Sequence, residues 1–131
     1  MADSIEYAAP DIALRADVFL DLVQRVWPGE YDAGRVQSAL ERTINVTAWD
    51  DGRLVGCVRI LTDGYLFATV PEILVDPEYQ RQGVGRRLME HAYTLSPAGV
   101  FLGAQPGNEG FFERLGFQRN LMGFCKRKNR R

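Results

Sequence analysis

The sequence is poor in the residues that build metal and disulfide sites. Its 131 residues include two cysteines and one histidine, and Cys57 and Cys125 lie far apart and form no C-x-x-C pair. Together with His91 they do not supply the four ligands of a usual structural zinc site. We therefore expect neither a bound metal nor a disulfide framework.

Long apolar runs are missing as well. No uninterrupted stretch approaches the ~20 apolar residues of a membrane-spanning helix, and residues 1–6 lack the cationic stretch and apolar core of a leader. With 46% apolar and 25% charged residues, the composition is typical of one compact domain. We expect a single domain over residues 1–131 with a basic tail at 126–131, in the cytoplasm and with no membrane partner.

Charge is balanced overall but divided along the chain. Residues 1–79 hold 14 acidic and 6 basic residues, whereas residues 80–131 hold 3 acidic and 10 basic ones. The second part could attract an anion, although five of its basic residues form the tail and could simply be solvated. Because the tail lacks aromatic residues and the rest of the chain is acidic, we expect no nucleic-acid partner.

Hydrophobic periodicity predicts the elements of an α+β domain. A short strand at 5–7 precedes a helix capped by Asp11 and ended by Pro28-Gly29, and a second helix runs from Asp32 to about residue 43. Strands at 44–49, 54–61 and 65–75 form an antiparallel meander, with Pro71 predicting a bulge or an edge. A helix at 84–95, a strand at 100–104, a helix at 108–115 and a strand at 117–126 follow. The fourth strand returns through a helix, so it lies parallel to the third.

The segment before residue 84 is the most informative part of the chain. Glycines at the start of a helix let successive backbone N–H groups point into one concavity, where an anion such as phosphate binds. The segment is not a Walker A loop, because no Lys-Ser or Lys-Thr occurs, and not a dinucleotide fingerprint, because Leu88 replaces the third glycine. What remains is Q-x-x-G-x-G from Gln80 to Gly85, with three arginines around it: Arg81, Arg86 and Arg87.

This motif resembles the acyl-CoA-binding signature of the GNAT superfamily of N-acyltransferases. The segment F-F-E-R-L-G-F at 111–117 is similar to the family's F-[YF]-E-[KR]-L-G-F, and the order of helices and strands agrees over nearly the whole chain. The resemblance implies the GNAT fold: a mixed central sheet, made of an antiparallel meander plus a β-α-β crossover, with helices on both faces. It also implies acetyl-CoA as the cofactor and an amine of a small molecule or peptide as the acceptor, whose identity a fold cannot give.

The resemblance further implies which residues hold the coenzyme. The pyrophosphate would lie on main-chain amides of the glycine loop, and the pantetheine arm between the strand that ends at Val75 and the strand near Leu102. A backbone N–H near Ile73 or Leu74 would stabilise the developing oxyanion. The expected coenzyme contacts are Ile73, Leu74, Val75, Arg81, Gln82, Gly83, Val84, Gly85, Arg86, Asn108 and Phe112.

Glu72 is the expected general base, since an ammonium of pKa near ~10 must lose a proton before it attacks. The alternative is a strand carboxylate that only faces solvent. At position 112 many relatives have a tyrosine, but phenylalanine has no proton to give to the departing thiolate. Water, Tyr79 or Tyr93 could supply it, or the protein is an acyl-CoA sensor with little turnover.

The loop at 27–32 borders the acceptor site by the same resemblance. Trp27, Glu30 and Tyr31 could receive a cationic amine through aromatic faces and charge, whereas the alternative places Trp27 in the core. The oligomeric state stays open, and pairing of the last strand across a two-fold axis would give a homodimer.

Overall fold

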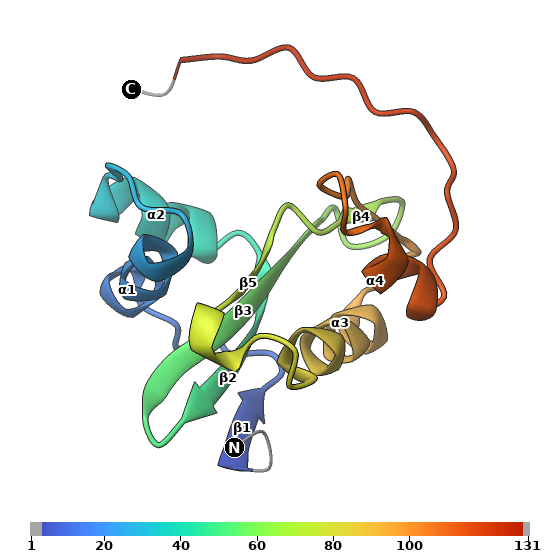
Figure 1. The fold of residues 1–131 in the computed structure, drawn as a ribbon. Coiled ribbons are helices and arrows are strands. Elements are labelled where there is room, and N and C mark those ends of the chain that lie inside the picture. The colour runs from blue at the N-terminus through green and yellow to red at the C-terminus, as the bar shows by residue number, and fades with distance from the viewer. Residues whose placement is uncertain (1–3, 130–131) are drawn as a thin grey trace.

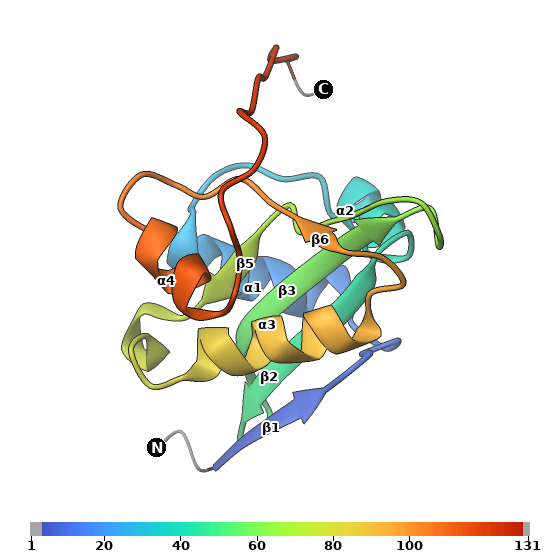
Figure 2. The same cartoon turned by 90° about the vertical axis from the view of Figure 1, so that its right-hand side faces the viewer.

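The computed structural model describes residues 4–129 and contains one six-stranded mixed sheet with helices on both faces (Figures 1 and 2). The strand order is β1-β2-β3-β4-β6, and β5 pairs with β3 beside β4. This is the α+β architecture that the sequence predicts. The elements are β1 (Ile5–Ala8), α1 (Ala16–Val26), α2 (Ala33–Leu40), β2 (Ile44–Asp50), β3 (Arg53–Thr62), β4 (Ala68–Thr69), β5 (Ile73–Val75), the 3-10 helix η2 (Pro77–Tyr79), α3 (Val84–Leu95), β6 (Val100–Phe101) and α4 (Glu109–Arg114).

Two apolar cores lie on opposite faces of the sheet. Helices α1 and α2 cover one face and α3 covers the other (Figure 1). Val55 and Val58 of β3 belong to the core under α3, whereas Leu54 and Cys57 belong to the core under α1. Val55 and Val58 are three residues apart, so strict alternation would place them on opposite faces. Val55 joins the core under α3 because the pairing with β2 is irregular between Leu54 and Gly56.

The predicted antiparallel meander is confirmed. Asp51 and Gly52, which join β2 to β3, have φ angles of 51° and 82°. Such left-handed conformations are the ones a tight two-residue hairpin requires. The strands pair in register from Ile44 opposite Ile60 to Asp50 opposite Arg53, with one irregularity after Ala48.

The third strand of the meander is divided around Pro71, where the sequence predicts a bulge or an edge. β4 pairs with β3 on one side and in parallel with β6 on the other, which confirms the crossover through α3. β5 pairs with β3 alone within residues 4–129. The sheet therefore splays after the hydrogen bond from the Val70 N–H to the Phe101 carbonyl (3.1 Å).

Helix α1 begins five residues after the predicted cap, so that prediction is wrong. Asp11 is instead held on β2, where its N–H donates to the Asn45 carbonyl (2.7 Å) and its carboxylate accepts from the Thr47 hydroxyl (2.6 Å). The first N–H of α1, on Ala16, donates to the side-chain oxygen of Gln37 on the neighbouring helix (2.8 Å). The cap comes from a tertiary contact that spacing alone does not predict.

The other helices begin close to their predicted positions. Asp32 caps α2 by accepting from the Arg35 N–H (2.9 Å), although this helix ends at Leu40 rather than near residue 43. Gly83 precedes α3 and Asn108 precedes α4. Within residues 4–129, none of the helices combines the length and the hydropathy of a membrane span.

The strand predicted at 117–126 is not formed. Residues 117–129 run away from the sheet as irregular chain (Figures 1 and 2), and Leu121, Met122 and Phe124 are 73–91% exposed. The prediction is wrong because β6, the neighbouring edge, has only two residues in strand geometry and cannot order a ten-residue partner. Arg130 and Arg131 of the predicted basic tail lie outside the described residues.

Candidate active site

The glycine loop enters α3 through left-handed backbone conformations. Gly83 has a φ of 86° and Arg81 a φ of 65°. In the described part of the chain no side chain caps the start of α3, so the first N–H groups of this helix have no intrahelical partner and no cap. Together with the positive end of the helix dipole, they can hold an anion.

The space around the two glycines tests whether a pyrophosphate fits. A Cβ on Gly85 would meet the Phe111 ring at 3.4 Å and Val75 at 3.7 Å, so the start of α3 packs closely on α4 and β5. Among the described residues, a Cβ on Gly83 would meet only the Arg86 guanidinium, at 3.8 Å. The loop is closed toward the sheet and open outward, which fits a diphosphate held by main-chain amides.

Three arginines lie in or next to the loop, and the Arg86 guanidinium approaches Gly83. Arg81, Arg86 and Arg87 are all exposed, and the only ion pair recorded for them within residues 4–129 is a long one, from Arg86 to Glu90 (3.7 Å). The Arg87 guanidinium lies 5.7 Å from the centre of the Tyr7 ring. These groups can reach a bound anion without breaking a buried contact.

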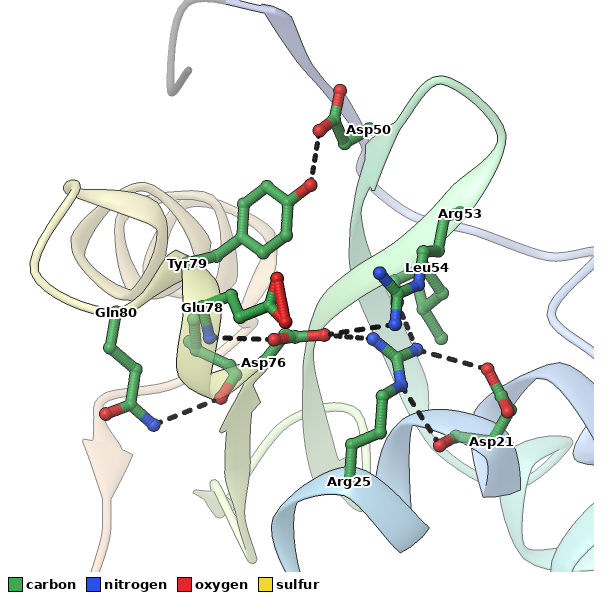
Figure 3. Close-up of polar contacts among 10 residues, drawn as sticks. Asp21, Arg25, Asp50, Arg53, Leu54, Asp76, Glu78, Tyr79 and Gln80 are labelled. Atoms are coloured by element: carbon green, nitrogen blue, oxygen red, sulfur yellow. Dashed lines mark hydrogen bonds and ion pairs between the residues drawn. The ribbon is translucent and has the colours of Figure 1, made fainter.

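Hydrogen bonds fix residues 78–82, which join β5 to the glycine loop. The Gln80 amide donates to the Val75 carbonyl (3.2 Å), and the Gln82 amide donates to the Glu78 carbonyl (3.1 Å). The Tyr79 hydroxyl donates to the Asp50 carboxylate (Figure 3). This bond lowers the pKa of Asp50 and raises the pKa of Tyr79, so Tyr79 is a poorer proton donor than a free phenol.

Glu72 does not simply face solvent. Its side chain is 15% exposed and forms a bidentate ion pair with Arg59 of β3, with 2.8 Å between Nη2 and Oε1. The hydrogen bond to Glu72 raises the pKa of Arg59. Arg59 follows Cys57 by two residues and therefore lies on the α1 face of the sheet. A carboxylate has about four lone-pair sites, so this pair leaves some of them free for a water or an amine.

The backbone of β5 has one open edge. Val75, Leu74 and Ile73 pair with Gly56, Cys57 and Val58 of β3. On the other edge the sheet is splayed toward residues 102–105, and no strand lies there in the described part of the chain. Outward N–H and C=O groups of β5 are thus available to an extended ligand, as strand addition requires.

The loop after α1 is folded but exposed. Trp27 is 48% exposed, so the alternative that buries this residue in the core is wrong. The Tyr31 hydroxyl donates to the Trp27 carbonyl (3.0 Å), and Gln24 exchanges two hydrogen bonds with Gly29 (2.7 and 3.1 Å). Glu30 is exposed beside them. An aromatic face and a carboxylate are therefore presented together on an ordered loop.

The last two candidate coenzyme contacts, Asn108 and Phe112, lie just before and within α4. Asn108 is exposed, and its side chain caps nothing in the described part of the chain. Phe112 is buried, with ring centres 5.0 Å from Phe111 and 5.8 Å from Phe117. The structure therefore places Phe112 mainly in the core, next to the residue that contacts Gly85.

The candidate residues meet at the splayed end of the sheet. Glu72 leads directly into β5, β5 leads through Asp76 into the glycine loop, and α1, which precedes the acceptor loop, packs on β5. Sequence reasoning missed Arg59, the partner of Glu72. A charged residue within an apolar strand was the one signal for Arg59, and its partner could not be found without the strand register.

Comparison with known proteins gives one consistent family. The sequence profile of the acetyltransferase (GNAT) domain matches residues 41–119. The chain is similar to GCN5-related N-acetyltransferase 2, chloroplastic, of Arabidopsis thaliana, with 37% identity over 70 residues. That match covers 50% of this chain and 27% of the plant protein, so the chain spans about a quarter of that relative's length.

Solved structures agree with the fold over nearly the whole chain. A GNAT family acetyltransferase from Streptococcus pneumoniae has a TM-score of 0.75 and 26% identity, covering 95% of this chain and 98% of its own. AAC(6')-Iy, solved with the bisubstrate analogue CoA-S-monomethyl-acetylneamine, has a TM-score of 0.73 and 16% identity, with coverage of 95% and 98%.

Proposed function

The chain belongs to the GNAT acetyltransferase family, and on that premise we propose that it transfers an acetyl group from acetyl-CoA to a primary amine. The acceptor is a small molecule or a peptide, and the amine attacks directly in a ternary complex. The observation that carries the proposal is the open, uncapped turn of Gly83 and Gly85 at the start of α3.

The coenzyme site consists of the glycine loop, the open edge of β5 and the start of α4. When bound, acetyl-CoA supplies the activated acetyl thioester. Amides of the loop from Arg81 to Arg86 would hold its pyrophosphate, and a β5 N–H at Ile73 or Leu74 would donate to the thioester carbonyl. Asn108 and the small exposed part of Phe112 would lie beside the pantetheine arm. The rigid packing of Gly85 on Phe111 and Val75 supports this assignment.

Glu72 removes the proton that keeps the acceptor unreactive. The nitrogen of an ammonium group has no free lone pair, so it can attack only after a base has taken its proton. Glu72 accepts it, directly or through one water, on a lone pair that Arg59 leaves free. Arg59 meanwhile holds the carboxylate in one orientation on the α1 face. Trp27, Glu30 and Tyr31 bind the cationic acceptor on the same side.

The departing thiolate receives its proton from water. Phe112 has none to give, and the proton of Tyr79 is engaged by Asp50. A thiol has a pKa near ~8.5, so the thiolate leaves readily and an acid adds only a modest acceleration. The exposed Tyr93 is the remaining protein candidate.

Phe112 also favours a second candidate function. A family fold with an intact coenzyme loop and no tyrosine at this position suits an acyl-CoA sensor that turns over slowly. A cytoplasmic location, expected from the sequence, belongs to the proposal as well. A homodimer does not, because the last strand, whose pairing would form it, is absent from residues 117–129.

One experiment in two stages tests the function. Calorimetry with coenzyme A comes first, and we expect saturable heat with one site per chain. Acetyl-CoA is then mixed with polyamines, amino acids, aminoglycosides, arylalkylamines and peptides, while thiol release and product mass are followed. Acetylated product supports the enzyme, whereas binding without product on any amine supports the sensor. Absence of coenzyme binding would refute both.

A further inference from the structure

Asp76 lies between β5 and the glycine loop and is almost fully buried, with 3% of its side chain exposed. Its N–H donates to the Val55 carbonyl of β3 and its carbonyl accepts from the Tyr79 N–H, both at 2.8 Å. One carboxylate oxygen, Oδ1, accepts from the Glu78 N–H at 2.8 Å and caps η2. A single residue thus ends the strand and begins the turn that leads to Gly83.

The other carboxylate oxygen of Asp76 points to a different layer of the protein. Oδ2 pairs with the guanidinium of Arg25 near the end of α1 (Figure 3). Arg25 also donates to the Leu54 carbonyl (2.7 Å) and to the Asp21 carboxylate (3.2 Å). Three partners therefore fix the guanidinium, which lies two residues before Trp27.

We propose that the ion pair between Arg25 and Asp76 is a positioning bridge. It fixes the acceptor loop (residues 27–32) and the glycine loop (residues 81–86) relative to each other. The inference rests on the proposed function and adds two residues to it. Neither residue touches substrate. Arg25 acts on the coenzyme through Asp76 and η2, and Asp76 acts on the acceptor through Arg25 and the end of α1.

Because the ion pair is buried, loss of either partner should disturb both the acceptor loop and the glycine loop. A buried carboxylate that loses its close counter-ion is strongly destabilised, and Arg53, half exposed and 3.7 Å away, is a weak replacement. Loss of Arg25 therefore turns the Asp76 carboxylate toward water, which disturbs the Oδ1 bond to Glu78 and the turn before the glycine loop. Conversely, loss of the Asp76 charge frees the end of α1, because Arg25 keeps only its bonds to Leu54 and Asp21.

Two neighbouring charges provide matched controls. Arg53 approaches Asp76 at 3.7 Å but is half exposed, and Asp21 binds Arg25 but is 72% exposed. Exposed ion pairs contribute little. The variants Arg53→Gln and Asp21→Asn therefore change the same network without removing the buried bridge.

The experiment compares Arg25→Met, Arg25→Lys, Asp76→Asn and the double variant with these controls. Coenzyme affinity is measured by calorimetry below the unfolding temperature of each protein. We expect Arg25→Met to weaken coenzyme binding about tenfold, although residue 25 lies outside the loop. Arg25→Lys, which keeps the charge, regains part of this affinity, and the double variant is no worse than Asp76→Asn alone. The controls stay within about twofold of the wild type.

Two further readouts separate positioning from a general loss of stability. Once an acceptor is known, the bridge variants should raise its KM while kcat changes less. Hydrogen exchange of residues 76–87, measured with no ligand, should be faster in Arg25→Met than in Asp21→Asn. Because exchange needs no coenzyme, it tests the bridge even if the proposed function fails.

Unchanged exchange and unchanged coenzyme affinity in Arg25→Met would overturn the inference. Equal effects of Arg25→Met and Asp21→Asn would also overturn it, since both variants would then act only on α1. Additive losses in the double variant would show that Arg25 and Asp76 act separately. The Arg25 variants decide the matter even if Asp76→Asn does not fold.

Discussion

The segment before α3 and the segment after α4 differ in how many contacts fix them to the rest of the protein. Before α3, residues 76–83 are fixed by Asp76, by Tyr79 and by the amide of Gln80. After α4, residues 117–129 are almost wholly exposed, and the ion pair recorded there, between Arg119 and Glu113 (3.4 Å), is exposed as well. Both segments were expected to be ordered, one as a loop and one as a strand.

The difference shows that order follows the partners available to a segment, more than its apolar content. The first segment is polar and yet fixed, because its hydrogen-bonding groups meet a buried carboxylate and a strand end. The second contains Leu121, Met122 and Phe124, but these side chains find no core within the described structure. Apolar residues order a chain only where they can be buried.

The largest contrast is expected between two carboxylates paired with arginine: Glu72, which precedes the first region, and Glu113, which precedes the second. Glu72→Gln should lower kcat at pH 7 about 100-fold, because the proposed base is lost, while coenzyme affinity stays within about twofold. The deficit should shrink toward pH 9, where more of the amine is free. Glu113→Gln, which removes the exposed partner of Arg119, should leave kcat unchanged. An unaltered rate in Glu72→Gln at pH 7 would remove Glu72 from the mechanism.

Two glycines give the next contrast. At Gly83, with φ of 86°, a β-branched side chain is strained by about 1–3 kcal/mol, so Gly83→Val should weaken coenzyme binding about 10- to 100-fold. A Cβ added to Gly123, in the exposed segment, would meet no atom of the described residues within 4 Å. Gly123→Val should leave the affinity unchanged in the same calorimetric titration. Equal effects at the two positions would contradict the assignment of the loop.

A smaller effect is expected where the motif departs from the family. Phe112→Tyr adds a hydroxyl to a ring packed against Phe111 and Phe117, and we expect its rate of thiol release to change less than about threefold. In the proposed mechanism water protonates the leaving group, so a second proton donor would add little. A large gain, measured at saturating acetyl-CoA, would mean that the proton donor is missing from this chain.

Much of the fold follows from local patterns in the sequence. The meander, the turn at Asp51-Gly52 and the helix after Gly83 depend on residues close in the chain, and all three are confirmed. Contacts between distant segments were not predictable in this way. The cap of Ala16 by Gln37, the pair of Glu72 with Arg59 and the late start of α1 each depend on which elements pack together. The roles of the site residues stay predictions.

Removal of residues 120–131 should have the smallest effect. The described part of this segment, residues 120–129, has exposed side chains, and within residues 4–129 it forms no strand pairing with β5. Coenzyme affinity should therefore stay within about twofold, and the unfolding temperature should hardly change, since surface changes are usually within about 0.5 kcal/mol. Solubility should rise as Leu121, Met122 and Phe124 are lost. If the truncated chain instead bound coenzyme tenfold more weakly, the segment would have to cover the site when ligand is present, and the two regions would not be independent.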